Sequence, residues 1–279
     1  MRNFNIIGRP DGLGNRIEEV ILVHAYCSKK NQKANYIWQN KHKQRTYSVK
    51  FTCKNLKISD TIEIDIPFKK TSDLQLNIGQ DEILKFAKDI VPSFNIRFES
   101  DIKPIGIHIR GTDRILNNGH PHFMKDRKEL FSYLSKTLEL VNSIRPKYLF
   151  ICSDDDKIRK IFIDNLDSKI VIVEPVYDKD VSAEYIDFFA LTLCEKTVMC
   201  SKFSSFAITA SLIANSPIVT FSYDEDVARR YQALFQYQPN ISYNKDLYSL
   251  YSSTISDKLK AVKQRLLTMC KNALKRILH

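Results

Sequence analysis

Glycine is scarce in this chain: only seven of its 279 residues are glycine, whereas about 7% would be usual. Six of them fall into two groups, at positions 8, 12 and 14 and at positions 106, 111 and 119. Glycine lets the backbone adopt a positive φ or approach another group very closely. The two groups therefore mark candidate walls of a functional site, with ordinary turns as the alternative.

The motifs that define several other protein classes are absent. The six cysteines are scattered with no C-x-x-C pair, which favours buried, reduced thiols over a zinc site or a disulfide framework. The segment G-L-G-N-R has isoleucine at position 17, where a G-x-G-x-x-G fingerprint needs a third glycine. No Walker P-loop or G-x-S-x-G elbow occurs. Dinucleotide-binding and hydrolase functions thereby lose most of their support.

Long apolar runs are absent as well. No stretch reaches the roughly 20 apolar residues that span a bilayer, and no segment of signal-peptide length precedes the first expected strand. We therefore expect a cytoplasmic protein whose membrane contact is at most peripheral, on the inner face of the cytoplasmic membrane. The formal net charge of +11 favours anionic partners. The basic residues of the chain are dispersed and its aromatic residues lie mostly in apolar runs, so we do not expect nucleic acid as the partner.

Apolar runs alternate with amphipathic segments along most of the chain, which predicts an α/β fold with a parallel, doubly wound sheet. In the second half we expect strands at 104–110, 148–152, 170–173, 197–200 and 217–221 and helices at 126–143, 157–166, 183–194 and 203–214. In the first half we expect strands at 4–7, 34–38, 47–52 and 61–66 and helices at 15–28 and 81–90. The tyrosine-rich stretch 224–256 reads as one helix followed by a loop.

Two prolines, Pro92 and Pro104, bracket a polar stretch that predicts a domain boundary. We expect an N-terminal α/β lobe at 1–98 and a second lobe at 99–255, with a cleft between them. Residues 256–279 have one apolar and one basic face. Such a helix lies on an anionic membrane surface or packs across the other lobe.

The decapeptide I-G-I-H-I-R-G-T-D-R at 105–114 concentrates the chain's most informative side chains. Residues two apart on a strand share a face, so His108 and Arg110 emerge together, opposite the isoleucines. The carboxyl ends of parallel strands are where ligands bind in open α/β sheets. Arg110 is thus placed to hold a phosphate through two parallel hydrogen bonds. The alternative is an internal ion pair with Asp113.

Two further expected strands end in polar residues. Asp154, Asp155 and Asp156 follow the strand at 148–152 and could bind a divalent metal or cap the next helix. Ser204 and Ser205 stand where the helix at 203–214 begins. Hydroxyls and free backbone amides at a helix start form an anion site, although the two serines could equally act as caps.

Four segments, taken in order, resemble the fucosyltransferase superfamily of GT-B glycosyltransferases. They are G-L-G-N-R, G-I-H-I-R-G-T-D, F-I-C-S-D-D and the stretch D-F-F-A-L-T-L-C-E-K-T-V-M-C-S-K-F-S-S-F. The resemblance covers residues 8–16 and 104–222 and includes the H-x-R-x-x-D hallmark. It implies two Rossmann-like lobes and an inverting, metal-independent transfer of fucose or a related sugar from a GDP-sugar co-substrate, with no cofactor.

The resemblance also implies roles for individual residues. Arg110 would neutralise the β-phosphate of the departing GDP, which is the charge that builds in the transition state. The remaining donor-site residues implied are His108 and Asp113 around that phosphate, Asp154 and Asp155 beside guanine or ribose, Asp187 near the nucleotide, Ser204 and Ser205 on the phosphates, and Asn15 with Arg16 across the cleft.

The sequence departs from the resemblance at the general base. Some relatives have an acidic residue a few positions after the H-x-R-x-x-D aspartate, whereas here that place is taken by Leu116 to Gly119, which include no acidic residue. His120, His122 and Asp11 are the candidates for that role. We expect a glycan or lipid-linked oligosaccharide acceptor in bacterial-type surface polysaccharide synthesis. A catalytically silent relative that binds nucleotide sugars is the alternative, and a nucleic-acid-binding protein is a more distant one.

Overall fold

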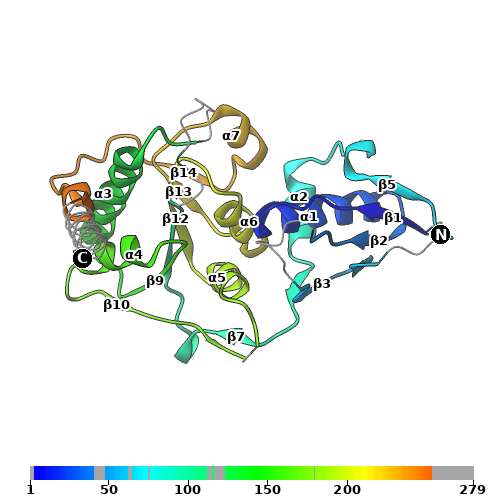
Figure 1. Ribbon diagram of the computed structural model, residues 1–279, viewed down its shortest axis with the longest axis horizontal. Helices are drawn as coiled ribbons and strands as arrows, with labels where there is room; N and C mark the ends of the chain where they lie inside the picture. The colour runs from blue at the N-terminus through cyan, green and yellow to red at the C-terminus, as the bar shows by residue number, and fades with distance from the viewer. Residues whose placement is uncertain are drawn as a thin grey trace, which may run out of the picture.

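The computed structural model describes residues 3–40, 48–61, 65–74, 76–111, 115, 123–178 and 180–252 (Figure 1). Within these residues the chain forms two six-stranded sheets and a two-stranded ribbon. No helix of this part is long and apolar enough to cross a membrane. The amphipathic helix expected at 256–279 lies outside the described residues.

The first sheet is mixed and has the strand order β5-β1-β2-β4-β3-β6. Its strands are β1 (Asn3–Ile7), β2 (Lys33–Ile37), β3 (Phe51–Cys53), β4 (Leu56–Ser59), β5 (Phe68–Lys70) and β6 (Ile90–Pro92). Strand β1 is parallel to β2 and β5, and β2 to β4, whereas β3 runs antiparallel to both of its neighbours. Helices α1 (Leu13–Lys29) and α2 (Gln80–Ala87) accompany this sheet, together with a short 3-10 turn at Thr71–Asp73.

The second sheet is entirely parallel, with the order β10-β9-β8-β12-β13-β14. Its strands are β8 (Ile105–Ile109), β9 (Tyr148–Ser153), β10 (Val171–Ile172), β12 (Lys196–Cys200), β13 (Ile218–Thr220) and β14 (Phe235–Tyr237). Its helices are α3 (Arg127–Ile144), α4 (Asp156–Ile163), α5 (Ala183–Thr192), α6 (Ser205–Ala214) and α7 (Glu225–Tyr231). A separate two-stranded ribbon is formed by β7 (Ile96–Arg97), which pairs with β11 (Val176–Tyr177). A 3-10 turn at Glu99–Asp101 follows β7 in the chain.

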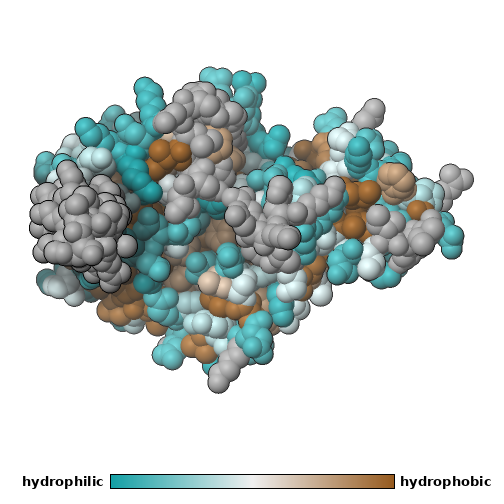
Figure 2. Space-filling model, viewed as in Figure 1, coloured by the Kyte–Doolittle hydropathy of each residue, from teal (hydrophilic) through white to brown (hydrophobic). Residues whose placement is uncertain are grey.

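Helices cover both faces of the second sheet (Figure 1). The isoleucines of β8 lie in one apolar cluster with α3 and α4. On the other face, α5 and α6 belong to a second cluster that continues into α1 and the first sheet. Helix α6 lies between the second sheet and α1 (Figure 1). One apolar cluster therefore spans both sheets. Figure 2 shows that the visible surface is mostly hydrophilic, with hydrophobic residues in separate patches.

The two halves approach each other very closely at Gly14, in the first turn of α1. A Cβ atom there would lie 2.5 Å from Phe206 Cα and 2.7 Å from the Ser205 carbonyl carbon, both in the first turn of α6. The Thr209 hydroxyl donates a hydrogen bond to the Gly14 carbonyl oxygen at 3.2 Å. Only glycine lets the two backbones meet at this distance, so Gly14 sets the packing of α1 on α6.

Glycine and left-handed backbone are separated in the described part of this chain. The described glycines all lie outside the left-handed region, so those with close neighbours are there for space. Left-handed positions are occupied by other residue types, including the C-caps of α3 and α6, Arg145 (φ 45°) and Asn215 (φ 50°). The glycine groups singled out in the sequence therefore mark close approaches in the residues that the structure describes.

Most of the expected elements are confirmed, and the exceptions lie near sheet edges. All five strands expected in the second half and the helices around them are present. The strand expected at 61–66 is wrong for its described residues: β4 lies before it, and the Thr61 and Ile66 carbonyls accept hydrogen bonds from the Asn35 and Asn5 side chains. Loop carbonyls satisfied by side-chain amides need no neighbouring strand. Strand β14 lies within 224–256, where we expected one helix and a loop.

The Gly14 contact gives a stability prediction. We expect Gly14→Ala to lower the free energy of unfolding by about 1–3 kcal/mol, because overpacking against backbone outweighs the usual gain of alanine in a helix. Urea unfolding measures this. Gly79→Ala is the control, since its nearest neighbour would be a flexible Glu82 oxygen at 3.8 Å, and we expect its cost to stay below about 1 kcal/mol. Equal losses in both variants would contradict the role assigned to Gly14.

Candidate functional site

Arg110 lies at the carboxyl edge of the second sheet, next to two other strand ends. Ile109 at the end of β8 pairs with Ser153 of β9 and with Cys200 of β12. The residues that follow these three strands, Arg110, Asp154 and Ser201, therefore emerge at the same edge. The Arg110 side chain is 18% exposed. The parallel register thus brings a partly buried guanidinium to the edge where such sheets bind ligands.

Asp154 fixes the start of the loop after β8. Its Oδ1 accepts a hydrogen bond from the Gly111 backbone N–H at 2.9 Å, and its Oδ2 lies 4.0 Å from Arg110 Nε. A Cβ at Gly111 would lie 2.7 Å from Leu130 Cδ2, so the backbone passes close to α3 here. Asp154 therefore orients Arg110 from β9. The expected alternative partner, Asp113, lies outside the described residues.

The neighbouring carboxylate, Asp155, caps a helix. It is the N-cap of α4, and its Oδ1 accepts hydrogen bonds from the Lys157 and Ile158 amides at 3.0 and 3.1 Å. Arg127 Nη1 lies 3.7 Å from the other oxygen. This is the capping alternative raised from the sequence. Among the described residues no three His, Cys, Asp or Glu side chains form a metal-binding group. That the reaction is independent of a metal ion stays a prediction.

Ser201 and Ser204 carry buried hydroxyls at the start of α6. Ser204 is the N-cap of this helix but its side chain makes no capping hydrogen bond. Both hydroxyl oxygens are buried and have no hydrogen-bond partner among the described residues, although most buried polar atoms have one. Ser205 occupies the first turn and is 6% exposed. A helix start with unsatisfied donors is an environment that favours an anion.

The first turn of α1 brings Asn15 and Arg16 toward the same region. Gly14 touches the first turn of α6, so its neighbour Asn15 lies close to Ser205. Arg16 differs from the expectation that it lines the cleft: it is fully buried, donates from Nε to the Asp11 carbonyl oxygen at 2.6 Å, and lies 5.1 Å from the Trp38 ring centroid. Its role in the structure is to hold the turn after β1 in place.

Asp11, a candidate general base, lies on that turn. Its carboxylate is half exposed and lies 3.6 Å from Arg9 Nε. Arg9 also donates from Nη2 to the Asn15 carbonyl oxygen at 2.8 Å. The other two candidates, His120 and His122, lie outside the described residues, so the choice of base stays a prediction.

His108 links Arg110 to α6. Its ring stacks on the ring of Phe206, with centroids 5.1 Å apart and planes at 21°. His108 is 5% exposed and lies on the opposite face of β8 from the isoleucines. The same Phe206 backbone contacts Gly14. The turn before α1, the start of α6 and the end of β8 are therefore held together through one aromatic residue.

Asp187, on α5, has the largest pKa shift among the described acidic side chains. Burial, followed by the repulsion of Glu174, raises the pKa of Asp187 from 3.8 to about 7, against a lowering influence from Arg159. Arg159 is itself bound to Glu174 and donates to the Ile151 carbonyl oxygen at 2.9 Å. A buried carboxyl group whose pKa lies near neutrality is typical of functional sites. Its position near a nucleotide stays a prediction.

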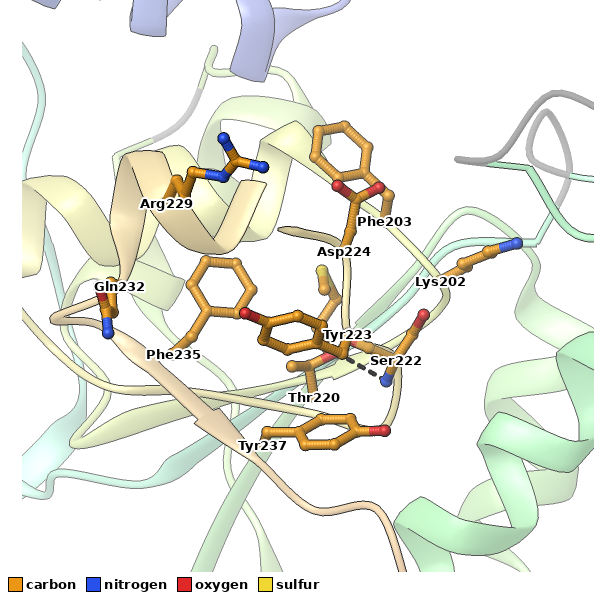
Figure 3. Close-up of a pocket in the computed structure, with 11 residues that line it drawn as sticks. Lys202, Phe203, Thr220, Ser222, Tyr223, Asp224, Arg229, Gln232, Phe235 and Tyr237 are labelled. Atoms are coloured by element: carbon orange, nitrogen blue, oxygen red, sulfur yellow. Dashed lines mark hydrogen bonds between the residues drawn. The ribbon is translucent and has the colours of Figure 1, made fainter. Parts of the chain in front are cut away.

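The structure adds a cavity that the sequence did not reveal (Figure 3). It has a volume of about 250 Å³ and lies at the carboxyl ends of β12 and β13, beside β14 and α7. Aromatic rings of Phe203, Tyr223, Phe235 and Tyr237 surround it. The tyrosine-rich stretch after residue 223 was the available signal. These rings meet only through the strand order and the turn after β13, which composition does not convey.

No family model and no curated protein matches this sequence. Solved structures do match, and they show that the chain has a fucosyltransferase-like fold. NodZ alpha-1,6-fucosyltransferase soaked with GDP-fucose aligns with a TM-score of 0.50 at 11% identity, over 81% of this chain and 96% of that chain. The fucosyltransferase NodZ from Bradyrhizobium aligns at 0.51 and 11%, over 81% and 96%. POFUT1 in complex with GDP aligns at 0.51 and 12%, over 80% and 99%.

The Asp187 titration gives a pH prediction. With a pKa of about 7 in the folded protein and 3.8 in the reference state, the folded protein holds an extra proton between these values. The free energy of unfolding therefore falls as pH rises through that window. We expect Asp187→Asn to gain about 1–3 kcal/mol over wild type between pH 5 and pH 8, measured by urea unfolding. Glu195→Gln, an exposed change just after the same helix, is the control, because Glu195 is not among the groups that shift Asp187. A parallel pH response in wild type and Asp187→Asn would refute the assignment.

Proposed function

We propose that this protein is an inverting glycosyltransferase that moves fucose or a related sugar from a GDP-sugar to a glycan acceptor without a metal ion. The observation that carries the proposal is the position of Arg110. It lies between Asp154 on one side and the unsatisfied start of α6 on the other. The aligned fucosyltransferases, whose structures include complexes with GDP and GDP-fucose, support GDP as the nucleotide.

The leaving group is the step at which Arg110 acts. As the bond between sugar and β-phosphate breaks, negative charge builds on the phosphate oxygens, and a fixed guanidinium beside them lowers the barrier. Asp154 holds Arg110 and the Gly111 amide before the donor arrives. Because the group is already oriented, less reorganisation accompanies the reaction.

The start of α6 supplies the remaining anion contacts. Ser204 and Ser205 with the first-turn amides face the diphosphate, where the positive end of the helix dipole adds to the charge of Arg110. Together these groups do the neutralising work for which other transferases use a divalent cation. Asp155 contributes indirectly, since it fixes α4 beside this edge.

The acceptor hydroxyl needs a base to remove its proton as the new bond forms on the face opposite the leaving GDP. His120, His122 and Asp11 are the candidates. Asn15 and Asp11 approach from the first sheet, so the acceptor and the transferred sugar lie between the turn after β1 and the edge of the second sheet. Asp187 lies on the nucleotide side, where an ionised carboxylate accepts hydrogen bonds from a base or ribose.

The biological setting that we propose is synthesis of a bacterial-type surface polysaccharide or lipid-linked glycan in the cytoplasm. The basic, amphipathic sequence 256–279 supports attachment to an anionic membrane surface, where such acceptors are assembled. A relative that binds nucleotide sugars without turning them over would show GDP binding alone.

The Arg110 role is tested by GDP affinity. We expect Arg110→Ala to bind GDP about 10- to 100-fold more weakly than wild type, because a hydrogen bond to a charged group contributes about 1.5–3 kcal/mol. Arg110→Lys keeps the charge but loses the paired donors, so its affinity falls between the two. Isothermal calorimetry measures all three, with exposed Arg97→Ala on β7 as the control. Wild-type affinity in Arg110→Ala would remove Arg110 from the site, and no GDP binding by wild type would sink the proposed function.

Metal independence is tested on the same binding reaction. We expect the affinity for GDP to stay within about twofold when the protein is treated with EDTA and when Mg²⁺ or Mn²⁺ is added afterwards, because Arg110 and the α6 amides already neutralise the diphosphate. If either cation tightens binding tenfold and EDTA reverses the gain, the acidic group from Asp154 to Asp156 becomes the candidate ligand set.

A further inference from the structure

The aromatic cavity beside β14 reaches the carboxyl ends of β12 and β13, and this is the sheet edge at which Arg110 lies. Strand β12 separates β8 from β13, and the loop after β12 serves both places. Ser201 and Ser204 of this loop belong to the candidate donor site, whereas Lys202 and Phe203 line the cavity. The cavity is therefore the immediate neighbour of the donor site, with one short loop as the common wall.

The chemistry of the cavity combines aromatic faces with polar groups. Tyr223 and Tyr237 are 61% and 43% exposed, and their ring centroids lie 5.7 Å apart with planes at 60°. Figure 3 shows Tyr223 and Phe235 side by side above Tyr237. Ser222, Asp224, Gln232 and Lys202 stand around the rings. Rings of this kind bury apolar area while polar groups at the rim fix orientation.

The walls are already held in position. The turn that presents Tyr223 is closed by Thr220, whose hydroxyl donates to the Ser222 carbonyl oxygen at 3.2 Å and accepts from the Ser222 amide at 3.3 Å. On the opposite side, α7 is tied to α1 because the Tyr231 hydroxyl donates to Glu18. Exposed tyrosines on a fixed frame lose little conformational entropy when a ligand covers them.

The size of the cavity limits what it holds. Its volume of about 250 Å³ falls below the roughly 300–1,000 Å³ typical of drug-sized ligands. A whole GDP-sugar is larger than this space, whereas a single sugar ring fits. A pyranose has apolar C–H faces for the rings and peripheral hydroxyls for the rim groups.

We propose that this cavity is the acceptor subsite and that it binds one pyranose ring of the glycan by stacking on Tyr223 and Tyr237. This inference rests on the proposed glycosyl transfer, because it is the neighbouring donor site that makes the bound sugar an acceptor. The sugar next to the stacked ring then reaches past Lys202 toward the donor.

The experiment measures binding of the labelled, full-length protein, with GDP present at saturation, to an array of immobilised neutral and acidic oligosaccharides. The variants are Tyr223→Ala and Tyr237→Ala, and the control is Tyr177→Ala, a 47% exposed tyrosine on β11. Calorimetry with GDP is run on every variant. Because both cavity tyrosines are largely exposed, their loss leaves the core untouched.

We expect wild type to bind a subset of the glycans, both cavity variants to lose about tenfold or more of that affinity, and the control to match wild type. GDP affinity should stay within about twofold throughout. The inference is overturned if the variants bind glycans as wild type does, or if wild type binds GDP but no glycan. It is also overturned if the variants lose GDP affinity, because the cavity would then hold the guanine base of GDP. Absence of GDP binding in wild type would instead defeat the proposed function. The glycan array alone would then still test whether the cavity binds a sugar ring.

Discussion

The contact between the first turns of α1 and α6 is the constraint on which the rest of the structure depends. Gly14 lets the two helices meet backbone to backbone, and the apolar cluster around them runs from the first sheet into the second. Phe206, at this contact, also carries the ring on which His108 stacks. A single packing contact therefore positions the first turn of α1, the start of α6 and the end of β8 relative to one another. The described candidate donor residues outside these three segments are Asp154 and Asp155, which follow β9, and Asp187 on α5.

Around Arg110 the protein places groups that restrain the loop after β8. Asp154 Oδ2 lies 4.0 Å from Arg110 Nε, and Asp154 Oδ1 accepts a hydrogen bond from the Gly111 amide. The two buried serine hydroxyls nearby have no partner among the described residues. These hydroxyls leave hydrogen-bond donors available at the sheet edge. Unsatisfied buried hydroxyls lower the stability of the free protein, and this stability is recovered when an anion binds.

The second sheet could be predicted from the sequence because its strands and helices repeat a regular apolar pattern, and because the period of two in β8 separates His108 and Arg110 from the isoleucines. Short strands such as β4 and β14 escaped, since three or four residues at irregular spacing carry little periodic signal. The burial of Arg16 was hidden because its partners, Trp38 and Asn40, lie on a different segment. For the same reason the aromatic cavity became visible only when β12, β13 and β14 were set side by side.

The uneven use of glycine has a consequence for engineering. Arg145 and Asn215 end α3 and α6 in the left-handed conformation, which costs most residues that have a Cβ about 1–2 kcal/mol and costs asparagine less. Both positions lie at the opposite ends of their helices from the sheet edge that carries Arg110. Helix ends remote from the candidate site therefore leave room for a gain in stability, although glycine at position 145 would also remove the exposed ion pair between Arg145 and Asp167.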